Sequence, residues 1–263
     1  MYEIRWGPFM KRHSIGIIIL LFLLSISIIS GCISSQNTMK RGTLTVGVCA
    51  QYPPTIYEEN GNLAGFDFDL MNEIAKRMNL NTDFKIYNSK SELFDALEKN
   101  EVDCIGSRTV NYERRKFVDF TRVYYYDSVR VAVPESSSVT LLKELKGKNL
   151  GVIEGSVSSE LVESYLTNIG CKCLYYDTPE NLTNAVENGE VDAVIGHEMY
   201  LEHISTKCNV QKRYLDEKLS VSYWAIPINK NNPNLRNSIN DILLEMENDG
   251  TLDELKLKWY GKY

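Results

Sequence analysis

The eight residues "ALEKNEVD" at positions 96–103 return as "AVENGEVD" at positions 185–192, 89 residues further along the chain. One alanine, two glutamates, one valine and one aspartate are identical in the two copies, and each copy runs on into a short apolar stretch. Such a segment is typical of the end of an amphipathic helix followed by a buried strand. The repeat therefore predicts two similar structural units that contain the same helix-to-strand step.

Strand and helix patterns alternate around the first copy. In chain order, the sequence predicts a strand at 43–48, a hairpin turn at Asn60-Gly61, a helix capped by Asp67 or Asp69, a strand at 81–88, a helix at 91–100 and a strand at 102–106. Strands that alternate with helices are joined by right-handed crossovers into a parallel sheet. We expect the first unit to be an α/β lobe.

The same alternation restarts after residue 148. It predicts a strand at 149–155, a helix at 158–170, a strand at 171–176, a helix at 179–189 and a strand at 191–196. Two extended stretches, 126–135 and 219–228, are the candidate connectors between the units. Ligands of open α/β sheets bind beyond the carboxyl ends of the strands, which points to a crevice between two lobes joined by a two-strand hinge.

The N-terminal segment predicts export from the cytoplasm. Lys11 and Arg12 precede an apolar run at 15–30, which is typical of a signal peptide at 1–31. "ISGC" at 29–32 resembles the lipobox of secreted lipoproteins, in which Cys32 carries the lipid. The alternative is an uncleaved membrane anchor, for which the run is short. We expect 32–42 to be a tether that holds the protein on the outer face of the cytoplasmic membrane.

Composition excludes some classes of function. The net charge is −6 and no basic block is present, which argues against nucleic-acid binding. Apart from Cys32 there are five cysteines, an odd number, so a complete disulfide framework is excluded. A pairing of Cys208 with Cys171 or Cys173 stays open. Neither a metal site nor a cofactor is predicted, and Asn181 lies in a lone glycosylation sequon, which is a weak signal.

Three stretches carry a resemblance to a known family. They are "GNLAGFDFDLMNEIAKRMNL" at 61–80, "RTVNYERRKFVDFT" at 108–121 and "ENDGTLDELKLKWYG" at 247–261. Together they resemble the extracellular solute-binding proteins of amino-acid-type ABC importers, family 3, over residues 43–261. The resemblance implies a two-lobed, type II periplasmic-binding-protein-like fold. It places the first part of lobe one at 43–128, lobe two at 129–221 and a return to lobe one at 222–263.

The resemblance also implies a set of ligand-binding residues. Thr109 and Arg114 match positions that grip a ligand α-carboxylate, and Ser107 matches a further donor. A guanidinium binds a carboxylate through two charge-assisted hydrogen bonds, which agrees with this role. Tyr52 matches an aromatic that stacks on the ligand, and Ser156 matches a hydroxyl at the cleft of lobe two.

Several positions depart from the family pattern. His197 stands where many members have an acidic residue that binds the ligand ammonium, and Glu198 is its neighbour and a candidate substitute. Cys49 replaces another acid, and Lys90 replaces an aromatic. The internal repeat pairs Arg108 with His197.

The charges at the candidate positions favour one class of ligand. The candidate cations are Lys90, Arg108 and Arg114, with His197 if it is protonated, against the candidate acids Glu154 and Glu198. Because a buried ammonium without a carboxylate partner is costly, we expect a ligand that carries a carboxylate. An acidic or neutral amino acid ranks above a basic one, and an acid without an amine stays open.

These expectations describe a monomeric binding protein that delivers a small ligand to an ABC permease with its ATPase. Two alternatives use the same fold. A dehydratase-like enzyme would need an acid or base in the cleft, for which His197 with Glu198 or Glu154 is the candidate set. A ligand sensor would need a separate receptor as partner.

Overall fold

The computed structural model describes residues 38–261, with gaps at 107, 111, 155 and 163–165. The predicted signal segment, the lipid-attachment residue Cys32 and the candidate ligand residue Ser107 lie outside the described residues. Among the helices in the described part of the chain, none is long and apolar enough to cross a membrane.

Lobe one is built around a five-stranded sheet with the strand order β5-β1-β6-β15-β8. These strands are β1 (Thr43–Val48), β5 (Asn81–Ile86), β6 (Cys104–Ile105), β8 (Val118–Phe120) and β15 (Pro227–Asn229). The helices of this lobe are α2 (Phe66–Arg77), α3 (Lys90–Glu98), α4 (Tyr112–Arg115), α8 (Pro233–Asn248) and α9 (Thr251–Tyr260). β1 pairs in parallel with β5 and β6, so the predicted parallel sheet is confirmed. A small antiparallel sheet of β2 (Gln51–Tyr52), β3 (Ile56–Glu59) and β4 (Asn62–Ala64) lies beside it.

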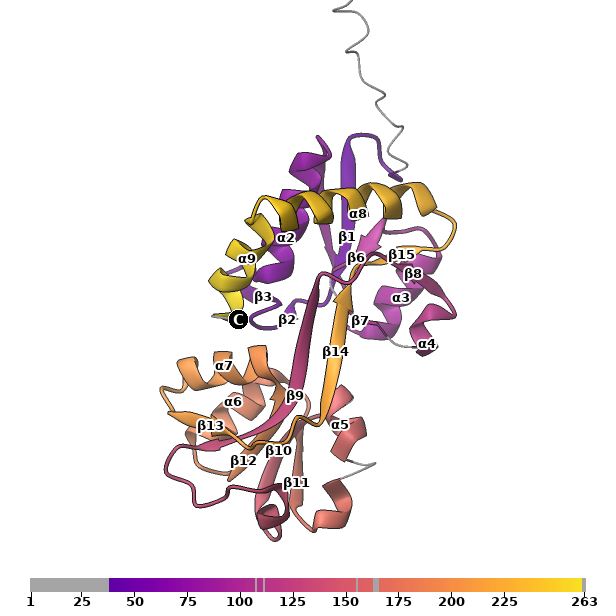
Figure 1. Ribbon diagram of the computed structural model, residues 1–263. Helices are drawn as coiled ribbons and strands as arrows, with labels where there is room; N and C mark the ends of the chain where they lie inside the picture. Colours follow the sequence, from indigo (N-terminus) through magenta and orange to yellow (C-terminus); the bar gives the residue numbers. More distant parts are fainter. Residues whose placement is uncertain (1–37, 107, 111, 155, 163–165, 262–263) are drawn as a thin grey trace, which may run out of the picture. The chain divides into compact units, whose positions relative to one another are not determined.

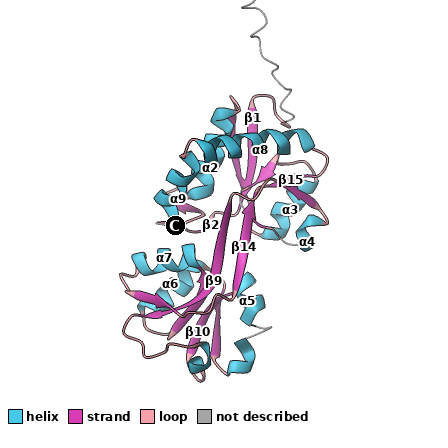
Figure 2. Cartoon of the chain, viewed as in Figure 1, coloured by secondary structure: helices cyan, strands magenta, loops and turns pink. Residues whose placement is uncertain are grey.

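Lobe two contains the parallel strands of a second sheet, whose order is β11-β10-β12-β9-β14-β7, with β13 on β9. Its strands are β10 (Asn149–Ile153), β11 (Lys172–Tyr176), β12 (Ala193–His197) and β13 (Lys212–Tyr214). Its helices are α5 (Val157–Leu161), α6 (Pro179–Glu187) and α7 (Glu198–Lys207), with 3-10 turns η2 (Leu142–Leu145) and η4 (Thr167–Ile169). Helices pack around the sheet in each lobe (Figure 2).

Two long strands connect the lobes. β9 (Tyr125–Pro134) and β14 (Ser220–Ala225) pair in antiparallel register from Ser220↔Val129 to Trp224↔Tyr125, and they run side by side between the lobes (Figure 1). At its lobe-one end, β14 also pairs with the short strand β7 (Arg108–Thr109). The predicted architecture of two α/β lobes joined by two strands is confirmed.

The internal repeat has a structural cause. The Asp103 carboxylate accepts the backbone N–H of Thr45 at 2.8 Å, and the Asp192 carboxylate accepts that of Asn149 at 2.9 Å. In each copy the aspartate therefore ties the connection after the helix to the first residues of the central parallel strand. The turn that follows the helix in each copy contains one residue with a positive φ. This residue is Asn100 in the first copy, with a φ of 57°, and Gly189 in the second, with a φ of 69°. The two copies are equivalent steps of the two lobes, as predicted.

One predicted helix boundary is wrong. α2 begins at Phe66, preceded by Gly65 with a φ of 119°, instead of being capped by Asp67 or Asp69. A Cβ atom on Gly65 would lie 2.5 Å from the carbonyl oxygen of Thr55, so this close approach requires glycine. Of the helix predicted at 158–170, the described residues form α5, single residues of π-helical type at 162 and 166, and the 3-10 turn η4.

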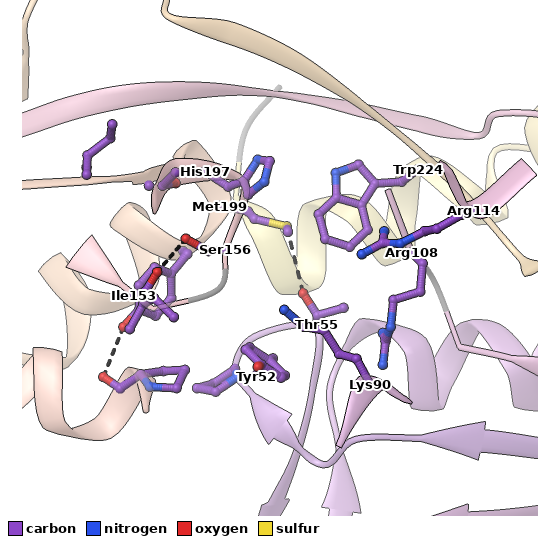
Figure 3. A pocket seen from close by; sticks show the side chains of 16 residues that line it. Tyr52, Thr55, Lys90, Arg108, Arg114, Ile153, Ser156, His197, Met199 and Trp224 are labelled. Carbon is purple, nitrogen blue, oxygen red and sulfur yellow. Dashed lines mark hydrogen bonds between the residues drawn. The ribbon is translucent and has the colours of Figure 1, made fainter. Parts of the chain in front are cut away.

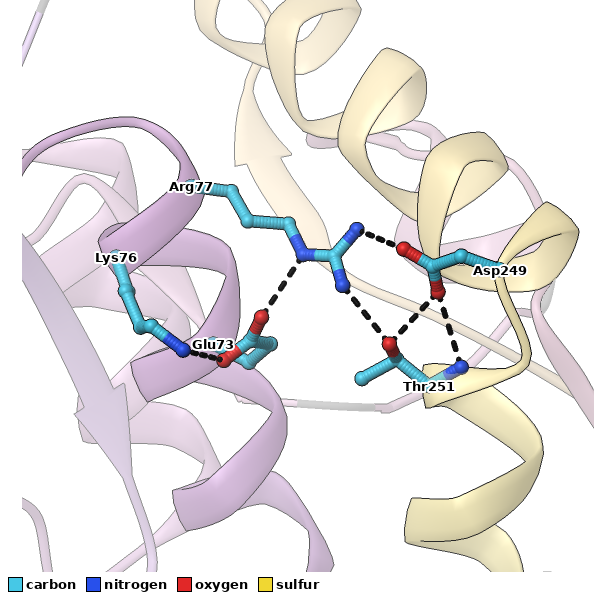
Figure 4. A network of polar contacts seen from close by, with 5 residues as sticks. All are labelled: Glu73, Lys76, Arg77, Asp249 and Thr251. Atoms are coloured by element: carbon cyan, nitrogen blue, oxygen red, sulfur yellow. Dashed lines mark hydrogen bonds and ion pairs between the residues drawn. The ribbon is translucent and has the colours of Figure 1, made fainter.

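The last two helices are fixed to lobe one by a polar network around Arg77 in α2. Its guanidinium lies 2.6 Å from the Asp249 carboxylate and 2.8 Å from the Thr251 hydroxyl, and its Nε lies 2.9 Å from Glu73 (Figure 4). Asp249 and Thr251 flank Gly250, where the chain passes from α8 to α9. The network therefore holds the junction of the C-terminal helices against α2.

Candidate functional site

A cleft between the lobes brings together side chains from both lobes and from the hinge. Its lining residues are Tyr52, Pro53, Thr55, Lys90, Arg108, Arg114, Ile153, Ser156, Ser158, Pro179, Ile195, Gly196, His197, Met199, Tyr200 and Trp224. Figure 3 shows the arginines and Lys90 on one side and His197 with Ser156 on the other. The carboxyl ends of β12 and β10 lie on this cleft, as the parallel-sheet rule predicts.

The lobe-one wall of the cleft is cationic. Lys90 is the first residue of α3, and its Nζ lies 5.6 Å from the centre of the Tyr52 ring. The Arg114 guanidinium, in α4, lies 5.5 Å from the centre of the Phe94 ring. Arg108, in β7, is buried with 8% of its surface exposed. Burial raises the pKa of the Tyr52 hydroxyl, which keeps this ring neutral beside the cations.

The lobe-two wall is mostly apolar and carries Ser156. The Ser156 hydroxyl donates to the Ile153 carbonyl at 2.6 Å and accepts the Ser159 backbone N–H at 3.2 Å, so it caps α5. A ligand would have to share this hydroxyl with the cap. Ile153, Ile195 and Met199 complete the wall with apolar surface.

His197 ends β12 and is neutral at neutral pH. Burial lowers the pKa of its imidazole to about 4, which favours the neutral ring over the charged one considered in the sequence. Its Nδ1 lies 3.7 Å from Oδ2 of Asp127, a buried carboxylate of the hinge strand β9. Desolvation, with a smaller contribution from the negative charge of Glu198, raises the pKa of the Asp127 carboxyl to about 7.

The two acids considered in the sequence lie away from the cleft. Glu198 is turned to Arg130, with 3.3 Å between its Oε1 and the guanidinium, and Glu154 is exposed. Among the described residues that line the cleft there are three cations and no carboxylate. The structure therefore does not place Glu198 as a direct partner for a ligand ammonium.

The sequence suggests three further residues as ligand contacts, which are Cys49, Thr109 and Ser107. Cys49 is buried and packs with Leu93 and Ile105 beneath the cleft, so it lies apart from the lining residues. The backbone of Thr109 pairs with Trp224 across β7 and β14, but its side chain lies outside the description, like all of Ser107.

The structure adds residues that the sequence reasoning missed. Trp224 projects from the hinge strand β14 into the cleft, and its ring packs at 5.5 Å and 70° against that of His197. Its Nε1 is buried without a hydrogen-bond acceptor among the described atoms. Asp127 was also missed, and the available signal for it was an acidic residue near the start of a strand that consists mostly of β-formers.

The described cysteines are all free thiols. Cys173 lies in the edge strand β11 and Cys171 immediately before it, with 3.6 Å between their sulfurs. The Cys208 thiol lies 3.6 Å from the Thr183 carbonyl oxygen. The open question of a Cys208 disulfide is thereby answered for this structure. No group of three or more His, Cys, Asp or Glu side chains suited to a metal ion occurs within the described ranges.

Comparison with known proteins identifies the family. Residues 44–262 match the family described as bacterial extracellular solute-binding proteins, family 3. The arginine-binding extracellular protein ArtP of Bacillus subtilis (strain 168) is 30% identical over 237 residues, which cover 88% of this chain and 92% of ArtP. The L-cystine-binding protein TcyJ of Escherichia coli (strain K12) is 26% identical over 230 residues, covering 86% of this chain and 85% of TcyJ.

A solved structure shows the same fold. The ancestral amino-acid-binding protein AncCDT-1, described as a precursor of cyclohexadienyl dehydratase, superposes with a TM-score of 0.73 at 27% identity. The superposition covers 84% of this chain and 97% of that structure. The family match spans both lobes, the hinge and the C-terminal helices, and the chain therefore belongs to family 3 of the bacterial extracellular solute-binding proteins.

Proposed function

We propose that this protein binds a small solute with a carboxylate group, most of all a polar or acidic amino acid, and delivers it to an ABC permease with its ATPase. The observation that carries the proposal is the cationic wall of Lys90, Arg108 and Arg114, which faces a wall without charge. In a cleft partly shielded from water, a guanidinium and a carboxylate form stronger hydrogen bonds than neutral groups do.

Within this proposal Arg114 and Arg108 hold the ligand carboxylate, with Thr109 and Ser107 as further donors. Tyr52 stacks on the ligand, and Lys90 lies close enough to that ring to attract an acidic side chain. Ser156 and His197 complete the site from lobe two. Glu154, Glu198 and Cys49 have no direct part in it, because each lies outside the lining of the cleft.

Delivery depends on movement about the hinge. The lobes are linked by β9 and β14, so a ligand that touches both walls favours the closed arrangement by its differential affinity. We propose that the permease recognises the closed lobes of a monomer. Cys32 would anchor the protein by a lipid after removal of 1–31, and 32–42 would act as the tether.

The first test is thermal unfolding of the protein with a panel of amino acids, dicarboxylates and other organic anions. A ligand at 100 times its dissociation constant adds about 2.7 kcal/mol to the free energy of unfolding, which is several degrees in a chain of this length. Arg114→Ala should abolish the shift, while Arg115→Ala, which changes the next and exposed arginine, should keep it. An equal shift in Arg114→Ala would contradict the carboxylate role.

A second candidate function is catalysis of the dehydratase type. The similarity to AncCDT-1 and the buried pair of Asp127 and His197 in contact with the cleft favour it. An acid or base with a shifted pKa is what such chemistry requires. Release of product from cyclohexadienyl substrates by the purified protein, without any transporter, would support this function over binding alone.

A further inference from the structure

His197 has a buried partner that the cleft itself does not reveal. In the sheet, His197 of β12 lies opposite Val129 of β9, and Asp127 is two residues before Val129. Residues two apart on a strand point to the same face, so the Asp127 carboxylate and the His197 ring lie on one side of the sheet. The 3.7 Å between Asp127 Oδ2 and His197 Nδ1 agrees with this register.

Asp127 is firmly held. Its Oδ1 accepts the Ser128 backbone N–H at 2.8 Å, and its Oδ2 accepts the Met199 backbone N–H at 3.2 Å. Only 1% of its side chain is exposed. The Trp224 ring also packs edge-on against the imidazole, with 5.5 Å between the ring centres, and this contact restricts the rotation of the imidazole. His197 Nδ1 is buried and makes no hydrogen bond with the described atoms, and Asp127 Oδ2 is 3.7 Å away from it. Because His197 lines the cleft, Nε2 is then the ring nitrogen that a ligand could reach.

A neutral imidazole carries its proton on one nitrogen and accepts a hydrogen bond on the other. A carboxylate beside one nitrogen places the proton there and makes the opposite nitrogen a better acceptor. We infer that Asp127 holds His197 in the Nδ1–H tautomer, so that His197 Nε2 accepts a hydrogen bond from the ammonium group of an α-amino acid.

This inference rests on the proposed function and makes the ligand class more specific. The carboxylate of the amino acid binds the lobe-one cations, and its ammonium binds His197 on lobe two, with the charge of Asp127 behind the ring. Asp127 is thus a positioning residue: it acts on the ligand ammonium through His197 and does not touch the ligand itself. A ligand held in this way bridges both walls, which is what lobe closure requires.

The first experiment compares each of the standard α-amino acids and L-cystine with the corresponding acid that lacks the amine, for example L-glutamate with glutarate. Binding is measured by calorimetry and thermal shift at pH 8 on the purified full-length protein. We expect at least one amino acid to bind at least tenfold more tightly than its amine-free counterpart. If only amine-free acids bind, this inference is wrong and the carboxylate proposal stands. If none of the acids binds, the proposed function fails and this inference fails with it.

The second experiment tests Asp127 itself. Asp127→Asn should reduce affinity for that amino acid at least tenfold and leave its amine-free counterpart within about twofold, so the selectivity disappears. Asp103→Asn is the matched control, because Asp103 is also buried and also accepts two backbone N–H groups, at 2.7 and 2.8 Å, but lies outside the cleft. Unchanged selectivity in Asp127→Asn would overturn the inference.

A third measurement can be made without any substitution in the binding site, so it does not depend on whether the Asp127 variant folds. The chain has three histidines, so nitrogen-15 NMR of the imidazoles can be assigned, with His203→Gln to separate the signals. We expect the His197 spectrum of the free protein to show Nδ1 protonated and Nε2 unprotonated. The opposite tautomer would overturn the inference even if Asp127→Asn proved too unstable to study.

Discussion

At the scale of single residues, Asp127 links the stability of the fold to pH. Burial raises the pKa of its carboxyl from an ordinary value of 3.8 to about 7. The folded state therefore binds this proton more tightly than the unfolded chain does. The resulting stabilisation is complete below pH 3.8 and is lost as the pH rises through about 7.

We expect Asp127→Asn, which cannot ionise, to escape this loss. Between pH 5 and pH 8 its free energy of unfolding should increase relative to the wild type by on the order of 2 kcal/mol. The titration of His197 is common to both proteins and largely cancels in the comparison. Denaturant unfolding at the two pH values measures the difference, and parallel pH profiles would contradict the predicted shift.

The sequence indicated part of the site at this scale, and physical reasons explain the rest. Arg114 in α4, Tyr52 at the end of β2 and His197 at the end of β12 lie in segments that a motif can identify, and they line the cleft. Trp224 reaches the cleft, and Asp127 reaches His197, only because β9 pairs with β14 and with β12 in one particular register, which no local pattern specifies. The charge of His197 depends on burial, which the sequence does not give.

At the scale of elements, the attachment of the C-terminal helices depends on Arg77. Arg77→Ala removes the contacts of α2 to both Asp249 and Thr251 at the junction of α8 and α9. We expect faster hydrogen exchange throughout α9 and an unfolding midpoint lower by roughly 2 °C, since a network of polar contacts contributes more than a single exposed pair. Lys76→Ala is the control, because Lys76 is largely exposed and bonds only Glu73 among the described partners. Equal exchange in the two variants would show that the other contacts of α9, which include those of Lys258 and Trp259 to Asp69 in α2, hold it without Arg77.

Elements with strong local signals were predicted correctly from the sequence. β1, the hairpin turn at Asn60-Gly61 and the helices predicted at 91–100 and 179–189, which are α3 and α6, are where their patterns place them. The start of α2 was missed because Gly65 is required by its close approach to Thr55, a contact from outside the helix. Local propensity determines the presence of an element, while tertiary contacts determine where it begins.

At the scale of the whole described molecule, the lobes touch beyond the hinge. Met199 belongs to α7 of lobe two, yet it is 4% exposed and packs in the apolar core of lobe one. The Thr55 hydroxyl lies 3.8 Å from its sulfur, and the rings of Tyr57 and His203 lie 6.3 Å apart across the same boundary. These contacts belong to one arrangement of the lobes, so they favour it over a more open one.

Met199→Ala should therefore change both stability and shape. Truncating a buried methionine costs about 2–5 kcal/mol, and here part of that loss comes from contacts between the lobes. We expect a larger radius of gyration in solution scattering without ligand. Ligand affinity should fall by roughly tenfold, because binding must then close a more open protein and the cleft wall loses the apolar surface of Met199. Met71→Ala is the matched control, since Met71 is fully buried in the same core but belongs to α2 of lobe one. It should lose similar stability and keep the scattering profile. If both variants scatter like the wild type, the contacts of Met199 stabilise lobe one without setting the angle between the lobes.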